Sequence, residues 1–354
     1  MMSRRPKTWV LWAMALGIGV LIALVETSPF AAGGGGLLLN LVFWATLLQG
    51  AVAAVAVGEL TNARWPASVK RELLAAHPLL FFHALLFLLL IPHLDSLPWA
   101  GEPNPWLDPS FFMIRNLVAL FIAAGLAHLL ARESLAEGPR KKLFAVLYLF
   151  AFVLSQTLVA FDWVMALSYP WYSTILGAFY FVEATYAGFA LGGICFFLLL
   201  RKTHRGDDSL VETHSRDLAT LMFGFSVLWA GLFFAQFLLI WYGNLPEEVG
   251  FVVERISRFP LREIAVIHLI FLFLVPFLTF LSTRAKEKRP VVLGVSVLIL
   301  AGLLLERLLY IHPATTVHAV TFLFEFIFML ILFATVLATR AFDADAPQQK
   351  TGRS

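Results

Sequence analysis

Carboxyl groups inside apolar stretches are the residues of this sequence with the clearest chemical potential. Glu183 stands ten residues inside the apolar stretch 173–200, and Glu325 stands eight residues inside 317–340. A charged side chain at the centre of a bilayer costs at least about 2.5–3.5 kcal/mol on insertion scales, so such a residue needs a partner or a task. A buried carboxyl group can hold a proton and release it to a neighbour. We predict that both glutamates are ion-paired or handle protons.

The ionisable residues of the apolar stretches are distributed unevenly across the predicted membrane. One half contains only Glu59, His83 and His128, with Glu59 at its edge. The other half contains His93, Asp95, Arg115, Asp162, Glu183, Glu263, His268, Glu306, Arg307, His318 and Glu325. From this half we select as proton-path candidates Asp162, Glu183, Arg115, Glu306, Glu325 and His268. We expect Arg115 to be the counter-charge of a carboxylate, and Glu263, His318 and Arg307 to extend from helix ends into water.

The elements that must position these residues are membrane-spanning helices. The chain of 354 residues is 60% hydrophobic and 14% charged, whereas soluble domains are about 45–50% apolar and about 25% charged. A bilayer core requires about 20 apolar residues per helix. Ten stretches qualify: 9–26, 37–58, 77–94, 111–131, 142–165, 173–200, 217–242, 262–283, 291–311 and 317–340. We predict an all-α polytopic membrane protein with a single membrane domain over 1–354.

Lysine and arginine residues determine the predicted orientation. With the N-terminus in the cytoplasm, 21 of the 26 basic residues fall on the cytoplasmic side. The outer side keeps Arg115, Arg255, Arg258, Arg262 and Arg307. Cytoplasmic loops of membrane proteins are enriched in these residues, so we predict that both termini are cytoplasmic and that 341–354 is a disordered cytoplasmic tail. We interpret the first stretch as a helix, because its apolar run exceeds the roughly 7–15 residues usual in a signal peptide; cleavage near Ala32 is the alternative.

The stretch AQFLLIWYGNLPEE at 235–248 ends a predicted helix at the outer interface. Trp and Tyr anchor helix ends there, and the Gly-Asn pair that follows is typical of a helix stop. The two glutamates after it therefore lie on the outer face. We predict that acidic residues of this face contact cations or a partner protein, with Glu247, Glu248, Asp95 and Asp108 as docking candidates.

The sequence gives little indication of a cofactor held by this chain. Cys195 is the only cysteine, which excludes a disulfide framework and an Fe–S cluster ligated within the chain. His83 and His128 have similar predicted depth on neighbouring helices, as two axial haem ligands require. No second pair accompanies them, and we expect hydrogen-bonded core histidines and no metal. A net charge of +3 and the absence of a nucleotide motif give no reason to expect a nucleic-acid partner.

Five stretches together resemble one family. FDWVMALSYPWYST (161–174), AQFLLIWYGNLPEE (235–248) and LDPSFFMIRN (107–116) are similar to the NrfD-type membrane subunit of alternative complex III that is called quinone-binding subunit 2. VAVGELTNARWPASVKRELLAAHPLL (55–80) and LLERLLYIHP (304–313) support the resemblance. Their order, spacing and predicted side of the membrane agree over about residues 40–313.

The resemblance implies a bacterial inner-membrane subunit made of two antiparallel four-helix bundles plus peripheral helices. The core would be 37–311, with 9–36 and 317–340 outside it. Its partners would be a paralogous NrfD-type subunit, a periplasmic Fe–S protein and multihaem cytochrome subunits, which carry the redox cofactors. The assembly oxidises quinol, releases protons outside, and passes electrons to cytochrome c or to an oxidase. Quinone or quinol is the ligand that such a subunit would contact, and Asp162, Arg115 and Glu306 match by position.

This chain also departs from the family. Relatives tend to carry Ser-Leu-Asp-Pro-His-Trp after Phe-Asp-Trp, whereas residues 166–171 read ALSYPW, so an acid and a histidine are missing. Glu306 stands where relatives usually have Asp. Two other functions stay open: a structural subunit that holds the paralogue and the periplasmic module in place, and an ion or solute transporter that acts alone.

Overall fold

The computed structural model describes residues 8–31, 33–63, 65–202 and 208–340. Within them, ten helices are long and apolar enough to cross a membrane, and every helix-length stretch expected from the sequence is present. These spans are Trp9–Glu26, Gly35–Thr61, Lys70–Ser96, Pro109–Leu135, Lys141–Ser168, Leu176–Leu198, Thr213–Gly243, Leu261–Phe280, Arg289–Ile311 and Ala319–Thr339. The described chain contains no strand, which confirms the all-α polytopic fold. The predicted tail 341–354 and the alternative cleavage point at Ala32 lie outside the described residues.

Seven spans are single α-helices: α1 (Thr8–Glu26), α2 (Gly35–Thr61), α5 (Pro109–Leu135), α7 (Leu176–Lys202), α8 (Asp208–Gly243), α13 (Arg289–Ile311) and α14 (Ala319–Arg340). Three are composite. The third joins α3 (Lys70–Ala75), α4 (Pro78–Leu86) and the 3₁₀-helix η3 (Phe87–Ser96), and the fifth joins α6 (Lys141–Leu158), the π-helix η5 (Val159–Val164) and the 3₁₀-helix η6 (Met165–Ser168). The eighth joins α10 (Leu261–Leu269), the π-helix η7 (Ile270–Leu274) and α11 (Val275–Phe280). Short helices lie between spans: η1 (Pro29–Ala31), η2 (Trp65–Ser68), η4 (Pro105–Leu107), α9 (Pro246–Ile256) and α12 (Thr283–Glu287).

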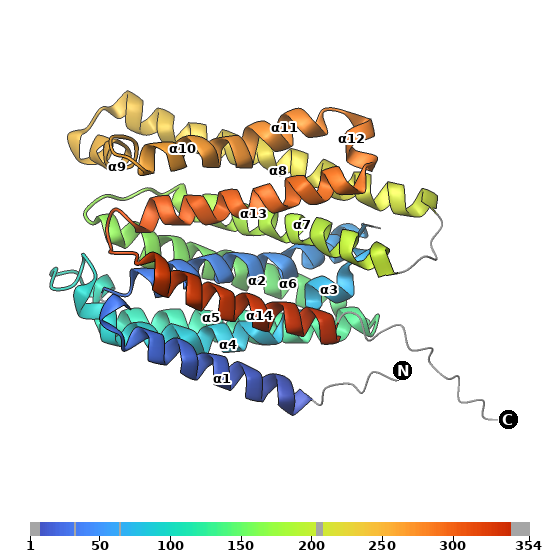
Figure 1. The fold of residues 1–354 in the computed structure, drawn as a ribbon, viewed down its shortest axis with the longest axis horizontal. Coiled ribbons are helices and arrows are strands. Elements are labelled where there is room, and N and C mark those ends of the chain that lie inside the picture. Colours follow the sequence, from blue (N-terminus) through green and yellow to red (C-terminus); the bar gives the residue numbers. More distant parts are fainter. Residues whose placement is uncertain (1–7, 32, 64, 203–207, 341–354) are drawn as a thin grey trace.

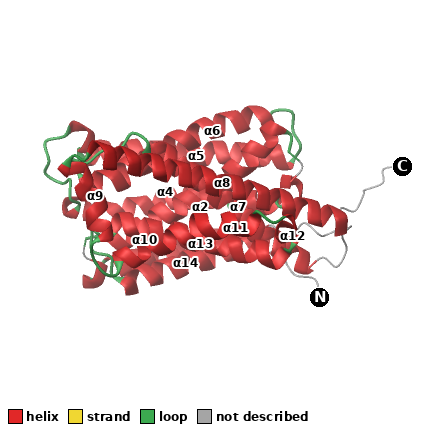
Figure 2. Cartoon of the chain, turned by 90° about the horizontal axis from the view of Figure 1, so that it is seen from above, coloured by secondary structure: helices red, strands yellow, loops and turns green. Residues whose placement is uncertain are grey.

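The spans form two four-helix bundles. The first contains α2, α4, α5 and α6, and the second contains α7, α8, α10 with α11, and α13. The bundles are joined mainly where α2 packs along α7. Helices α1 and α14 pack against each other, and α14 also packs on α2, so this pair is peripheral to the first bundle (Figure 1). Seen from above, the long helices run along one common direction and most loops lie at the two ends (Figure 2).

The joint between the bundles requires glycine on both helices. A Cβ atom added to Gly50 of α2 would overlap the carbonyl group of Ala184 on α7, and one added to Gly188 would overlap the carbonyl oxygen of Gly50. Small residues that let two helix backbones approach are typical of membrane helix pairs. In the most apolar part of each helix, 94% of the α2 residues but only 17% of the α8 residues are buried. Helix α2 is therefore the centre of the molecule, and α8 lies at its surface.

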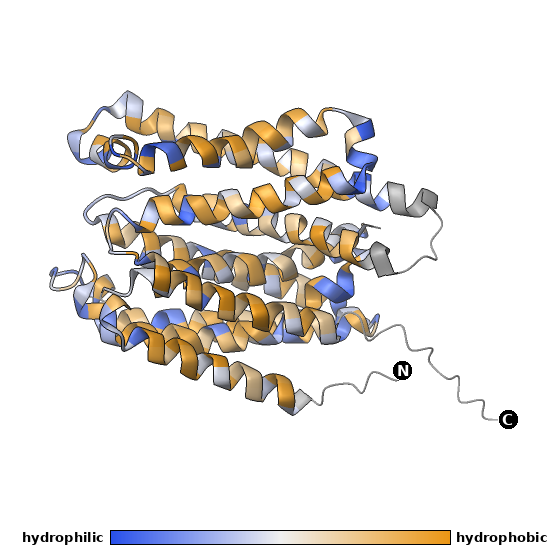
Figure 3. Ribbon diagram, in the orientation of Figure 1, coloured by the Kyte–Doolittle hydropathy of each residue, from blue (hydrophilic) through white to orange (hydrophobic). Residues whose placement is uncertain are grey.

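The two ends of the bundles differ in charge. We call the end with α3 and α12 the Lys/Arg-rich end, because it carries lysines and arginines such as Lys70, Lys141 and Lys286. The opposite end, with η4 and α9, is the Lys/Arg-poor end. Apolar residues fill the middle of the helices and hydrophilic ones gather towards the ends (Figure 3). Successive spans run in opposite directions, so the alternation on which the predicted topology depends is present.

Candidate functional site

Two glutamates and an arginine meet inside the second bundle. Glu183 comes from α7, and Glu306 and Arg307 are neighbours on α13; all three are 0% exposed. The Arg307 Nη2 group donates to Glu183 Oε2 at 2.5 Å, and Nη1 donates to Glu306 Oε2 at 3.3 Å. The two carboxyl groups are close neighbours, because both contact the same guanidinium. We call these three residues the carboxylate–arginine cluster.

Aromatic residues surround the cluster. Trp229 of α8 donates its Nε1–H to Glu183 Oε1 at 3.0 Å, and the guanidinium carbon of Arg307 lies 4.0 Å from the centre of the Tyr180 ring. Three buried polar atoms have no hydrogen-bond partner among the described residues: Glu306 Oε1, Arg307 Nε and the Tyr180 hydroxyl. Buried polar atoms are normally paired. The cluster therefore has open hydrogen-bonding positions, centred on Glu306.

The charges of the cluster do not balance when every group is ionised. Two carboxylates face one guanidinium, which leaves one excess negative charge among buried residues. An uncompensated buried charge is costly, and a proton on one carboxyl group removes it. Since Glu306 has a free oxygen and the weaker contact with Arg307, it is the member best placed to take up that proton.

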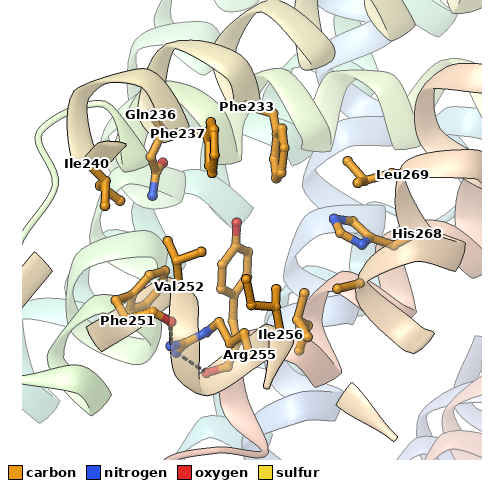
Figure 4. Close-up of a pocket in the computed structure, with 13 residues that line it drawn as sticks. Phe233, Gln236, Phe237, Ile240, Phe251, Val252, Arg255, Ile256, His268 and Leu269 are labelled. Atoms are coloured by element: carbon orange, nitrogen blue, oxygen red, sulfur yellow. Dashed lines mark hydrogen bonds between the residues drawn. The ribbon is translucent and has the colours of Figure 1, made fainter. Parts of the chain in front are cut away.

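A partly open cavity of about 290 Å³ lies close to the cluster, between α8, α9, α10 and α13 (Figure 4). It is lined by Phe233, Gln236, Phe237, Ile240, Phe251, Val252, Arg255, Ile256, Ala265, His268, Leu269, Leu309 and Tyr310. The His268 ring packs edge-on against Trp229, at 5.8 Å between ring centres, and against Phe233 at 6.0 Å. Trp229 is thus in contact with His268 on one side and bonded to Glu183 on the other, so His268 and Trp229 connect the cavity to the cluster.

The cavity suits a flat apolar ring that carries polar substituents. Phe233 and Phe237 project into it from α8, with the Gln236 amide beside them, and Val252 and Ile256 face them from α9 (Figure 4). His268 stands at one end. Its Nδ1 atom is 3.3 Å from the Ile264 carbonyl oxygen. Binding sites for small molecules typically combine such apolar walls with a few convergent polar groups.

Arg255 lines the cavity but is occupied in holding α9 in place. Its Nη1 donates to the Phe251 carbonyl at 2.7 Å, and its Nη2 donates to the Tyr310 carbonyl and the Ser168 hydroxyl, both at 3.2 Å. Burial lowers the pKa of Arg255 to about 10, so it remains charged at neutral pH. Phe251 also stacks on Trp171 with ring centres 3.7 Å apart. These contacts hold α9 in place along one side of the cavity.

The predicted pair of Asp162 and Arg115 forms a separate site in the first bundle. Asp162 Oδ2 accepts hydrogen bonds from Arg115 Nη2 at 2.7 Å, Arg115 Nε at 3.0 Å and Asn116 Nδ2 at 2.7 Å, and Oδ1 accepts one from Trp106 Nε1 at 2.8 Å. The Arg115 guanidinium also covers the Trp106 ring, at 3.9 Å from its centre. Both carboxylate oxygens are occupied. Asp162 is therefore an anchor that ties the loop before α5 to η5.

The structure does not unite the proton-path candidates in one network. Glu183 and Glu306 share the carboxylate–arginine cluster, and His268 lies behind Trp229, but Asp162 and Arg115 belong to the other bundle. Glu325 is buried elsewhere, on α14 beside Asn40 of α2. The sequence predicted their depth but carried no information on which helices are neighbours.

The expectation that Arg307 extends into water is wrong, because its side chain is fully buried and pairs with Glu183. Arg307 is four residues from the end of α13, but Arg255 of α9 bonds to Tyr310 and so covers this helix end. Glu263 behaves as a helix-end residue, with an exposed Arg262 guanidinium 2.8 Å away. The side chain of His318 is partly exposed.

The four docking candidates all lie at the Lys/Arg-poor end. Glu247, Asp95 and Asp108 are exposed and Glu248 is half-buried. Asp108 also caps α5 by accepting a hydrogen bond from the Phe111 amide at 2.9 Å, and the two glutamates occupy the first turn of α9. Acidic residues stabilise helix N-termini, so local structure explains part of this acidic surface.

The two histidines weighed as haem ligands have protein partners. His83 Nε2 lies 2.8 Å from the Leu41 carbonyl oxygen, and His128 Nδ1 lies 3.1 Å from His77 Nε2. No group of three or more His, Cys, Asp or Glu side chains among the described residues is arranged to hold a metal ion.

Sequence reasoning missed three members of the site: Trp229, Tyr180 and the helix α9. The signals were present but weak. Pro246 followed by two glutamates is a typical helix start, and Arg307 next to Glu306 is an unusual buried charge pair. Compared with models of known protein families and with curated proteins, the chain matches none. Fold and site together define a multi-pass helical membrane protein with a buried acid–base cluster beside an apolar cavity.

Proposed function

We propose that this chain is a membrane subunit of a quinol-oxidising respiratory complex, and that it contributes to the quinol site and the outer proton path. The observation that carries the proposal is the chain of contacts from His268 in the aromatic cavity through Trp229 to Glu183 of the carboxylate–arginine cluster. The resemblance of five sequence stretches to an NrfD-type subunit of alternative complex III supports it. The protein would lie in a bacterial inner membrane with its Lys/Arg-poor end outward.

The chemistry requires proton acceptors beside the ring. Oxidation of a quinol to a quinone releases two protons and two electrons. The electrons would pass to the Fe–S or haem centres of the partner subunits that the resemblance implies. His268 lines the cavity and accepts a proton from a ring hydroxyl. Glu306 takes up the second proton after it has released its own proton towards the Lys/Arg-poor end. Both protons are then released at the Lys/Arg-poor end, where basic residues are few.

The test uses the complex purified with its partners in mild detergent. His268→Phe and Glu306→Gln should each lower quinol-dependent reduction of the acceptor by at least tenfold, since a positioned acid–base group contributes on the order of 10²–10⁴-fold. Glu263→Gln, at the same end but half-exposed and paired with Arg262, is the matched control and should keep the native rate. Purification of the chain without any Fe–S or haem partner, or native rates in both variants, would contradict the proposal.

A structural role within the same complex is the second candidate. Asp162, whose hydrogen bonds are all satisfied, favours it, as does the missing acid and histidine at residues 166–171. A scaffold predicts that the same substitutions change the amount of assembled complex but not the rate per assembled complex. A stand-alone transporter would instead move its substrate in proteoliposomes that contain this chain alone.

A further inference from the structure

A second group of buried titratable residues lies where α1, α2 and α14 meet. Glu325 of α14 accepts a hydrogen bond from Asn40 Nδ2 of α2 at 3.0 Å, and its carboxyl group interacts with the neighbouring carboxyl group of Glu26 on α1. Glu26 in turn lies 2.7 Å from His93 Nε2 of η3. We call Glu26, Asn40, His93 and Glu325 the junction. It shares no residue with the carboxylate–arginine cluster or with the cavity of Figure 4.

The orientation of Asn40 is determined by its contacts. Its Nδ2 group also lies 3.2 Å from the carbonyl oxygens of Gly36 and Phe322, so all three neighbours of this atom are acceptors. The amide oxygen, Oδ1, must therefore point the other way, and it has no hydrogen-bond partner among the described residues.

A cavity of about 10 Å³ adjoins the junction, lined in part by Asn40, Trp44, His83 and Glu325. Each of these side chains has one buried atom without a hydrogen-bond partner in the described chain: Asn40 Oδ1, Trp44 Nε1, His83 Nδ1 and Glu325 Oε1. The remaining lining residues are apolar: Ile22, Leu37, Leu41, Leu86 and Met329. A cavity of roughly 10–15 Å³ with two to four polar partners is what one buried water molecule requires.

The hydrogen-bonding chemistry of the four atoms matches water. His83 Nε2 faces the Leu41 carbonyl, which can only accept, so this nitrogen carries the proton and Nδ1 of the neutral ring accepts. Trp44 Nε1 can only donate. A water molecule would accept from Trp44 and donate to His83 Nδ1 and to one of the oxygens of Asn40 and Glu325.

The charges at the junction indicate where a proton lies. Glu26 has His93 as its partner, but no lysine or arginine in the part of the chain that the structure describes contacts Glu325. The titratable groups around it are Glu26 on α1, His93 on η3 and His83 on α4. An ionised Glu325 would be a buried charge without a cation and beside a second carboxylate, whereas a proton on it lets it bond to Glu26.

We propose that the junction is a proton-binding site, in which Glu325 holds a proton next to Glu26 and one ordered water molecule bridges Glu325 to His83. Glu26 and His93 are the members that retain some exposure, at the Lys/Arg-poor end, and they connect the site to water there. A Cβ atom on Gly34 would lie 2.7 Å from His93 Cβ, so the glycine run at the start of α2 allows His93 to take this position. The inference does not depend on quinol chemistry.

The first test is infrared spectroscopy of the intact protein in lipid nanodiscs at neutral pH. The difference between wild type and Glu325→Gln should contain a protonated carboxylic C=O band that shifts in D₂O. Glu26→Gln should move this band, because it changes the neighbour of the protonated group, and Glu263→Gln should leave it unchanged. A difference spectrum with carboxylate bands alone would show that Glu325 is ionised and would overturn the proposal.

The second test addresses the water and also covers the case in which Glu325→Gln does not fold. Trp44→Phe removes one hydrogen-bond donor of the cavity and keeps an aromatic ring. If a water bridges Glu325 to His83, this variant should shift the band of the protonated carboxyl group. A density map of the wild-type protein at high resolution should show one peak within the cavity. An unshifted band, or a cavity without density, would remove the water from the proposal.

Discussion

At the scale of residues, the partners of a carboxyl group decide whether it can exchange a proton. Asp162 has donors on both oxygens, so a proton could bind only if a hydrogen bond broke first. Glu306 shares one arginine with Glu183 and keeps one oxygen free. Burial alone does not distinguish these residues, since both are almost fully buried. Their hydrogen bonds do, and they assign an anchoring role to Asp162 and a proton-binding role to Glu306.

The anchoring role of Asp162 predicts a loss of stability rather than of chemistry. Asp162→Asn should leave the mostly buried Arg115 guanidinium without its anion, a change that typically costs about 3–5 kcal/mol. Thermal unfolding in detergent should therefore begin at a lower temperature, while quinol turnover per folded complex stays native. Reduced turnover with unchanged stability would instead return Asp162 to the reaction.

The pairing of Arg307 can be tested with a double-mutant cycle. Arg307→Met should destabilise the protein by about 3–5 kcal/mol, because it leaves Glu183 buried without a cation. Glu183→Gln in the same chain removes that charge, so the double variant should recover part of the loss. Unfolding of the four proteins gives the coupling energy, which is expected at about 0.5–3 kcal/mol for residues in contact. Additive effects would mean that the 2.5 Å contact contributes no coupling.

Residue-scale predictions from the sequence succeeded where depth alone mattered. Glu183 and Glu325 are buried because both lie well inside an apolar stretch, and a window of sequence shows that directly. The partner of Glu183 was not predictable in this way. Trp229 is 46 residues away and Arg307 is 124 residues away, and nothing in the chain states that α7, α8 and α13 are neighbours.

At the scale of elements, the crossing of α2 and α7 depends on the absence of side chains. Gly50→Ala should destabilise the protein by about 1–3 kcal/mol, the usual cost of overpacking, because its Cβ would overlap backbone rather than a movable side chain. Gly224→Ala is the matched control, since no atom lies within 4 Å of the added Cβ on α8. In a helix interior this change should be neutral or should stabilise by up to about 1 kcal/mol. Equal effects on thermal unfolding would show that the helices can separate without cost.

The loop between α5 and α6 gives a pH prediction. Glu137 is bonded to Lys70 at 2.8 Å and to Lys141 at 2.5 Å, and hydrogen bonds from Lys141 and then Lys70 lower its pKa from 4.5 to about 2. A lowered pKa stabilises the fold above the ordinary value of 4.5, and this contribution is lost as the pH falls from there towards 2. Because the side chain is 65% exposed, we expect a small effect.

The matching experiment follows thermal unfolding across this acid range. Glu137→Gln should flatten the decline in stability between pH 4.5 and about 2. Glu102→Gln, an exposed glutamate in the loop at the other end, should keep the native pH profile. A steep acid decline that persists in Glu137→Gln would assign it to other carboxylates.

Element boundaries show what a sequence window can and cannot detect. The ten spans follow from apolar length, and the ends of the structural helices fall within a few residues of the predicted stretches, except at the starts of the third span (Lys70) and of α8 (Asp208). Helix α9 was not predicted from the sequence, because its 11 residues carry charges at both ends and are too few to span a membrane. Its position depends on Arg255 and Phe251, whose partners come from η6, α13 and Trp171.

At the scale of the whole molecule, the sides of the bundles are unequally covered. Helix α8 exposes large apolar side chains along its length, among them Val227, Phe234, Leu238, Leu239 and Trp241. Lipid or a paralogous subunit can cover such a face, because both provide apolar contacts. The apolar surface does not indicate which end of the bundles faces the cytoplasm. The charge pattern predicts this, because lysines and arginines concentrate at one end of the bundles. Orientation is therefore a property of the whole molecule that the sequence predicts, from its lysines and arginines alone.

Single-cysteine labelling tests that orientation in cells. The chain has one cysteine, Cys195, and it is buried. Cys195→Ala therefore gives a protein without thiols and leaves its surface unchanged. Glu102→Cys places an exposed thiol at the Lys/Arg-poor end, and Glu137→Cys places one at the Lys/Arg-rich end. If cytoplasmic loops carry the basic residues, a maleimide that cannot cross membranes should label only the first variant in intact cells with a permeable outer envelope. Both should react after the inner membrane is opened. Labelling of Glu137→Cys alone in intact cells would show that the molecule has the opposite orientation. A proton path through Glu306 and His268 would then open towards the cytoplasm.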